Sequence, residues 1–212
     1  LRLQSANASI YEAAKNTLSQ DCYFCDCSRR QLKSSSIYPG RCRHKTDYAP
    51  DHAIRIAVDH EQRAFNDACQ GPHRFTPSED FGDFIIWRRD QLVSYHLATA
   101  CDDGSDYSHI LRGVDLFDST PPQLYLMEKL GLTPPTYAHI PMLTYADGAK
   151  LSKQTQAPAL NNETPEANLR AALKFLGQDP PKAPKTVTQW LEWAVTNWRF
   201  NAIPRRLAPF VN

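Results

Sequence analysis

The chain has 212 residues, of which 42% are hydrophobic and 22% charged, and its formal net charge is +1. This length suits one domain with an appendage or two small domains. Because positive and negative charges balance, the net charge does not by itself predict a nucleic-acid partner. No apolar run approaches the roughly 20 residues of a membrane span, and the first residues lack the apolar core of a secretory signal, so we expect a cytoplasmic protein.

Apolar periodicity and turn residues predict strands that alternate with helices. In chain order we expect a helix over 7–19, strands over 53–58 and 83–89 with a loop-rich excursion or hairpin between them at 59–80, a strand ending at Leu111, a helix over 118–131, a strand over 137–143, and helices over 164–177 and 186–200. Thr120 is the expected cap of the 118–131 helix, and Gly131 suits its exit. The alternation favours an α/β middle and a helical C-terminal appendage.

Four of the six cysteines crowd into residues 21–44, which read DCYFCDCSRRQLKSSSIYPGRCRH. Cys25 and Cys27 are too close in sequence for an easy mutual disulfide. Clustered thiols in a cytosolic protein more often bind a metal ion. The cluster therefore favours zinc, and it leaves the set of ligands open.

A second motif, ADGAKLSKQ, lies at residues 146–154 and places Lys150 and Lys153 on either side of a small hydroxyl residue. Lysine is a mobile point charge, so such a loop can follow a phosphate group whose charge moves during a reaction. Taken alone, the pentapeptide KLSKQ is more readily interpreted as an exposed basic loop.

Several segments in order resemble the glutamyl group of class I aminoacyl-tRNA synthetases: EDFGDFIIWRRDQLVSYHLATACDD, ILRGVDL, YAHIPML and AKLSKQTQAPAL, the last with the KLSK form of the KMSKS-type loop. The chain after Lys153 has room for two helices and not for a large anticodon-binding region, so it resembles the shortened branch, the glutamyl-Q tRNA(Asp) synthetase family. The resemblance implies an α/β, Rossmann-type catalytic domain over 1–160 with its N-terminal part absent and a zinc-binding segment at 21–44. A helical, stem-contact-like subdomain would follow over 161–212.

The resemblance also implies a reaction and its partners. Members of this family activate L-glutamate with ATP, which we expect to be bound with Mg²⁺, and transfer it to the queuosine base in the anticodon of tRNA(Asp). We expect a monomer with no membrane partner.

Residue roles follow from the same motifs. Lys153 would stabilise charge on the ATP phosphates as the catalytic residue. Tyr95 would line the glutamate pocket, and the guanidinium fork of Arg112 would hold the substrate's carboxylate. Without the resemblance, Tyr95 reads as a core aromatic and Arg112 as a surface ion-pair partner. The ATP-binding loop would consist of Lys150, Leu151, Ser152, Lys153 and Gln154.

For the thiol cluster, the family pattern is Cys-x-Cys, a gap, then Tyr-x-x-x-Cys. It matches Cys25, Cys27, Tyr38 and Cys42, and it implies one structural zinc ion bound by three thiolates and an oxygen. A phenol with a pKa of about 10 is an uncommon zinc ligand. His44 is therefore an alternative fourth ligand, and a Cys22–Cys25 pair is a further one.

The sequence departs from the family in lacking a HIGH-type motif and the acidic residue that would recognise the amino group of glutamate. We therefore expect the natural protein to be longer at its N-terminus. Two other functions stay open: a truncated discriminating glutamyl-tRNA synthetase, and a non-catalytic, zinc-stabilised RNA-binding module. The remaining histidines, His139 among them, are interpreted as loop or packing residues, and Asp115 as a capping or surface residue.

Overall fold

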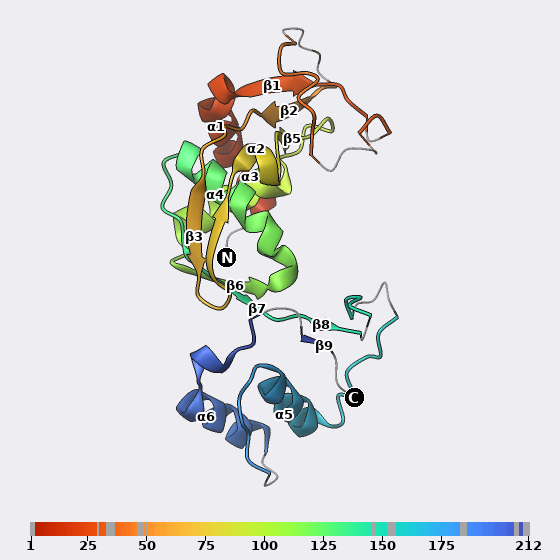
Figure 1. Ribbon diagram of the computed structural model, residues 1–212, viewed down its shortest axis with the longest axis vertical. Coiled ribbons are helices and arrows are strands. Elements are labelled where there is room, and N and C mark those ends of the chain that lie inside the picture. The colour runs from red at the N-terminus through yellow and green to blue at the C-terminus, as the bar shows by residue number, and fades with distance from the viewer. Residues whose placement is uncertain are drawn as a thin grey trace. The chain divides into compact units, whose positions relative to one another are not determined.

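A computed structural model describes residues 3–209 except 29, 33–36, 46–48, 50, 146, 152–155, 183–185 and 206–207 (Figure 1). Its contacts divide the chain into two compact units. The first comprises residues 1–66, 72–110 and 117–136, and the second comprises residues 67–71, 111–116 and 137–212. The chain passes between the units more than once, and the predicted domain boundary at residue 160 stays a prediction.

A three-stranded sheet with antiparallel neighbours lies in the first unit, in the order β1–β2–β5. Its strands are β1 (Cys22–Cys25), β2 (Ala53–Ile56) and β5 (Phe84–Trp87). The preceding helix α1 (Ala8–Thr17) and the strands β2 and β5 confirm three predicted elements. Strand β1 was not predicted, because four residues that include two thiols show no clear alternation of apolar and polar side chains.

Three further helices belong to the first unit: α2 (Pro77–Asp80), α3 (Tyr95–Asp106) and α4 (Thr120–Lys129). Ser94 caps α3, since its side chain accepts the N–H of Leu97. The predicted helix over 118–131 is confirmed, but Thr120 is a fully buried first residue and not a cap. The reason is that a 3-10 helix, Val114–Ser119, leads directly into α4 and leaves no extended residue to act as one.

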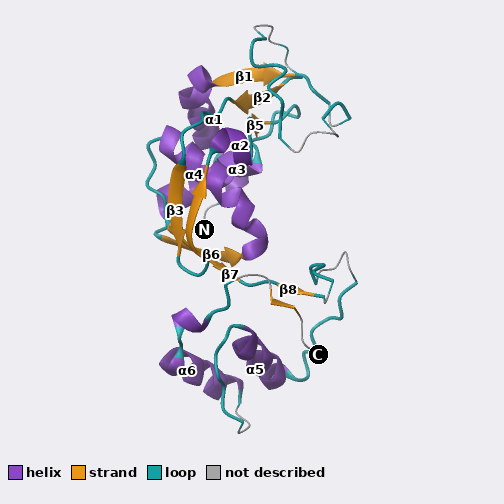
Figure 2. Cartoon of the chain, in the orientation of Figure 1, coloured by secondary structure: helices purple, strands orange, loops and turns teal. Residues whose placement is uncertain are grey.

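Short strand pairs complete the β structure, as Figure 2 shows. They are β3 (Arg63–Asp67) with β4 (Gly71–Phe75), β6 (His109–Gly113) with β7 (Thr136–Ile140), and the parallel pair β8 (Leu143–Thr144) with β9 (Ala208–Pro209). The β3–β4 pair confirms the predicted hairpin. The strand expected over 137–143 ends at Ile140, because Pro141 has no N–H to continue the ladder.

Two helices, α5 (Pro165–Phe175) and α6 (Val187–Asn197), confirm the predicted helical C-terminal region within the second unit. Pro165 occupies the first turn of α5. Gly177 follows the end of α5 with a φ of +71°, and a Cβ there would lie only 1.9 Å from the carbonyl oxygen of Ala202, so only glycine fits. A reciprocal capping box between Thr186 and Gln189 starts α6. Among the described residues, every helix is too short or too polar to cross a lipid bilayer.

Candidate functional site

Three thiols and one phenol converge at the end of β1, whose last residue is Cys25. The Sγ atoms of Cys25, Cys27 and Cys42 all lie within 4.8 Å of one another, and those of Cys27 and Cys42 are 3.5 Å apart. The Oη atom of Tyr38 lies 3.6 Å from Cys25 Sγ and 3.5 Å from Cys27 Sγ. The N–H of Cys42 donates to the same phenol oxygen at 3.0 Å. The predicted donors, which come from both ends of the stretch from Cys25 to Cys42, therefore meet at one point.

This donor set fits a tetrahedral zinc ion. Sulfur atoms bound at about 2.3 Å to such an ion lie roughly 3.8 Å from one another, close to the spacing found here. His44 is exposed, and in the part of the chain that the structure describes, the only group of at least three His, Cys or acidic donors at this spacing is the three cysteines. The arrangement thus places Tyr38 beside the thiols, and neither His44 nor Cys22.

The charge around the cluster is set by Arg55, a buried residue of β2. Its Nε donates to Cys25 Sγ at 3.2 Å, and its Cζ lies 3.9 Å from the centroid of the Tyr38 ring. Burial raises the pKa of Cys25, but hydrogen bonds from Arg55 and Tyr38 outweigh it and hold the pKa below its ordinary value. Burial raises the pKa of Cys42 and, with hydrogen bonds to the sulfurs, that of Tyr38. Cation binding would therefore release protons from this cluster.

A buried carboxylate, Asp83, ties the cysteine turn to the sheet. It accepts the hydroxyl of Tyr23 at 2.6 Å, Nε of Arg43 at 2.6 Å and the N–H of Val58 at 3.0 Å. Burial raises the pKa of Asp83, but the hydrogen bonds from Arg43 and Tyr23 bring it below its ordinary value. Since Arg43 follows Cys42, this network fixes the position of the third thiol. Sequence reasoning missed Asp83, because nothing in DFGDF distinguishes it from a surface acid.

Tyr95 is the first residue of α3 and is 52% exposed, so its interpretation as a core aromatic is wrong. Its ring lies 5.6 Å from that of His96. The exposed phenol can meet a ligand at the start of the helix.

The sequence predicted a strand that ends before Arg112, but Arg112 lies within β6. Its Cζ is 4.5 Å from the centroid of the Tyr137 ring, and Tyr137 is almost completely buried. A guanidinium over the face of a ring at this distance makes a cation–π contact, so Arg112 is more than a surface ion-pair residue.

The KLSK loop begins in a tight turn after β8. The N–H of Tyr145 donates to the carbonyl of Ala149 at 2.8 Å, and Gly148 adopts a φ of +85°. Lys150 forms an ion pair with Asp115, and the N–H of Leu151 donates to the carbonyl of Leu143 at 3.1 Å. Ser152, Lys153 and Gln154, including the predicted catalytic lysine, lie outside the described residues.

The Lys150–Asp115 pair brings the KLSK loop to the segment that carries Arg112. All three residues belong to the second unit, whereas Tyr95 belongs to the first. The interpretation of Asp115 as a capping or surface residue missed this pairing, because the two partners are 35 residues apart.

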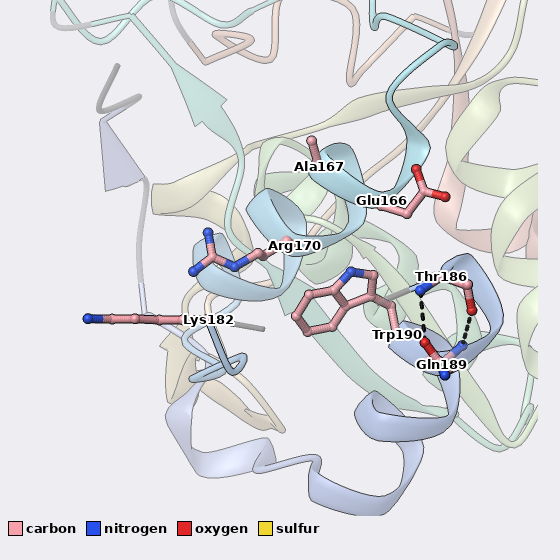
Figure 3. Close-up of a pocket in the computed structure, with 7 residues that line it drawn as sticks. All are labelled: Glu166, Ala167, Arg170, Lys182, Thr186, Gln189 and Trp190. Carbon is pink, nitrogen blue, oxygen red and sulfur yellow. Dashed lines mark hydrogen bonds between the residues drawn. The ribbon is translucent and has the colours of Figure 1, made fainter. Parts of the chain in front are cut away.

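A separate pocket of about 610 Å³ lies between α5 and α6 (Figure 3). It is lined by Glu166, Ala167, Arg170, Lys182, Thr186, Gln189 and Trp190. In Figure 3 the charged ends of Arg170 and Lys182 extend to one side of the Trp190 ring. In the capping box, the side chain of Thr186 accepts the backbone N–H of Gln189, and the side chain of Gln189 accepts the backbone N–H of Thr186. The start of α6 therefore offers fewer free N–H groups to an anion.

Comparison with known proteins agrees with these motifs. The model of the catalytic domain of class I tRNA synthetases (E and Q) matches residues 14–180. The glutamyl-Q tRNA(Asp) synthetase of Pseudomonas fluorescens is 41% identical over 211 residues, which cover 97% of this chain and 71% of that protein. The protein of the same name from Pseudomonas aeruginosa is 44% identical over 187 residues, which cover 86% of this chain and 64% of the relative.

A solved structure, the glutamate-tRNA synthetase from Elizabethkingia anophelis, superimposes with a TM-score of 0.74 at 18% identity, over 98% of this chain and 52% of that one. At this identity the likeness shows the fold alone, and the family model confirms the predicted class I catalytic domain. The chain belongs to the class I tRNA synthetases of the E and Q group and, within them, to the glutamyl-Q tRNA(Asp) synthetase family. It spans about two thirds of the length of the curated relatives described above.

Proposed function

We propose that this protein activates glutamate with ATP and transfers the glutamyl group to the queuosine base in the anticodon of tRNA(Asp). Support comes first from the names of relatives that are 41% and 44% identical. The single structural observation that carries the proposal is the ion pair between Lys150 of the KLSK loop and Asp115, three residues after Arg112. It joins the segment proposed for ATP to the segment proposed for glutamate.

In the activation step, a carboxylate oxygen of glutamate attacks the α-phosphorus of ATP, and the bond to the departing pyrophosphate breaks. Arg112 would hold the other carboxylate of glutamate through its two-pronged guanidinium, which leaves the reacting carboxylate free. The exposed phenol of Tyr95 would line the amino-acid pocket. Lys150 and Lys153 would stabilise the charge that develops on the phosphates, with Mg²⁺ bound to the nucleotide.

The cluster of Cys25, Cys27, Tyr38 and Cys42 would hold one zinc ion with a structural role. Four protein donors fill a tetrahedral shell and leave no position for a reacting molecule. Hydrogen bonds from Arg55 and the Asp83 network then serve to orient the ligands, as outer partners of metal sites do.

The proposal is tested by offering the full-length protein labelled glutamate and ATP with three RNAs: tRNA(Asp) that carries queuosine, tRNA(Asp) without it, and tRNA(Glu). We expect label on the queuosine-bearing tRNA(Asp) alone. Label on tRNA(Glu) would instead identify a discriminating glutamyl-tRNA synthetase. Binding of RNA without any labelling would favour a non-catalytic RNA-binding module.

A further inference from the structure

A buried acid–imidazole pair is connected to Arg112 through the ring of Tyr137. The proposed function assigns this pair no role. The Nδ1 atom of His139 is 2.6 Å from Oδ2 of Asp67, and both side chains are fully buried. The interpretation of His139 as a loop or packing residue is incomplete, because its acidic partner lies 72 residues away in the sequence. A buried pair of this kind is costly to form and restricts both side chains to one arrangement.

The pair joins the turn at residues 67–71 to strand β7. The second carboxylate oxygen of Asp67 accepts two N–H groups of its own turn, at 3.0 and 2.8 Å, and the N–H of His139 at 3.1 Å. Gln70 Nε2 donates to the carbonyl of His139 at 2.6 Å, and the N–H of Ala68 donates to the carbonyl of Tyr137 at 2.8 Å. Besides the contact between the two side chains, three of these hydrogen bonds reach β7 and hold this part of the strand against the turn.

The contacts continue from the pair to Arg112. Tyr137 and His139 are two residues apart on β7, so their side chains share one face of the strand. Their rings stack, with centroids 6.0 Å apart and planes at 24°. The other end of the series is the guanidinium of Arg112, 4.5 Å from the centroid of the Tyr137 ring. All four residues belong to the second unit.

We propose that Asp67 and His139 are positioning residues for Arg112, an inference that rests on the proposed role of Arg112 in glutamate binding. Arginine has a long side chain with considerable rotamer entropy, and a two-pronged grip on a carboxylate requires its fork to be aimed in advance. The Tyr137 ring provides the surface on which the fork lies. Asp67 fixes the orientation of the His139 imidazole, and the stacked imidazole fixes the ring.

Asp67→Asn tests this inference in the full-length protein. The amide keeps one oxygen for the backbone N–H groups of the turn, but it removes the charged acceptor from His139. We expect the KM for glutamate in ATP–pyrophosphate exchange to rise about tenfold, while kcat and the KM for ATP change less than about twofold. In an Arg112→Ala background, Asp67→Asn should add no further rise in the KM for glutamate.

Two further comparisons separate positioning from general loosening of the fold. Asp83→Asn removes another buried carboxylate that accepts an arginine, and it should lower the melting temperature while leaving the KM for glutamate unchanged. Tyr137→Phe keeps the ring under Arg112 and should keep the KM, whereas Tyr137→Leu should raise it. This second pair decides the question if Asp67→Asn does not fold.

Several outcomes would overturn the inference: a normal KM for glutamate in folded Asp67→Asn, an equal rise in Asp83→Asn, or a normal KM in Tyr137→Leu. Failure of the proposed activation of glutamate is recognised separately, because the parent protein would then show no glutamate-dependent exchange at all. In that case the role of Arg112 and the role of its positioning residues fall together.

Discussion

The thiol cluster and the surroundings of Arg112 hold their side chains by different means. The cluster takes its donors from one stretch, Cys25 to Cys42, and a cation can complete it. Arg112 depends instead on Tyr137, His139 and Asp67, which come from two other segments. The spacing of residues along the chain determines the thiol cluster, whereas tertiary contacts between distant segments determine the surroundings of Arg112. They should therefore fail differently: the cluster through stability, the Arg112 region through substrate affinity.

The largest effect is expected at the KLSK loop. Lys153→Ala should lower the rate of glutamyl-adenylate formation by about 100-fold or more, because it removes a cation from the developing charge on the phosphates. Its melting temperature should stay that of the parent. The measurement is glutamate-dependent ATP–pyrophosphate exchange, with Lys174→Ala on α5 as a control lysine. Near-normal exchange in Lys153→Ala would remove this residue from the mechanism.

Loss of a thiol should act on the fold. Cys42→Ser is expected to abolish zinc binding and to lower the free energy of unfolding by roughly 3 kcal/mol or more, since metal binding contributes directly to folding. Activity per folded molecule should change less than about threefold. Zinc content by elemental analysis and thermal unfolding measure the two effects, and Cys69→Ser supplies a buried thiol outside the cluster. A zinc-free variant that melts like the parent would show that the site does not hold the fold.

Substitution at the arginine should act on substrate affinity. Arg112→Lys keeps the charge but loses the planar fork, so we expect the KM for glutamate to rise about 10-fold to 100-fold with the melting temperature unchanged. Steady-state exchange kinetics at varied glutamate concentration measure it. An unchanged KM would show that Arg112 does not bind the carboxylate.

A matched pair of variants identifies the fourth zinc ligand. Tyr38→Phe removes the oxygen that lies 3.5 Å from Cys27 Sγ, and it should weaken zinc binding by about 10-fold or more. His44→Ala should leave zinc affinity unchanged, because His44 is exposed and stands outside the group of three thiols. Competition with a chromogenic chelator compares the two, and the reverse order of effects would make His44 the ligand.

The smallest effect concerns pH. The pKa of Asp83 is lower in the folded protein than in the unfolded chain, so its stabilising effect is present above the unfolded value of about 4 and is lost as pH falls through the folded value. The parent should therefore lose more stability than Asp83→Asn between about pH 5 and pH 3. Urea unfolding at each pH measures this difference, and parallel stability curves would contradict the assigned role of the carboxylate.

Local signals carried most of the sequence-based prediction. The helix expected over 164–177 is confirmed, with Pro165 in its first turn and Gly177 just after its end. The spacing of Cys25, Cys27, Tyr38 and Cys42 likewise identifies donors that meet in space. Pairings across long sequence separations could not be predicted, because spacing along the chain carries no information about them. Asp67 with His139, Asp115 with Lys150 and Arg43 with Asp83 are of this kind.

The proposed function requires that the glutamyl group reach the anticodon of tRNA(Asp) and not its 3′ end. The most direct test is to charge queuosine-bearing tRNA(Asp) with labelled glutamate, cleave it with a base-specific ribonuclease and locate the label among the fragments. We predict label in the anticodon-loop fragment. Label confined to the 3′-terminal fragment would contradict the proposed function and make the protein an aminoacylating synthetase of the ordinary kind.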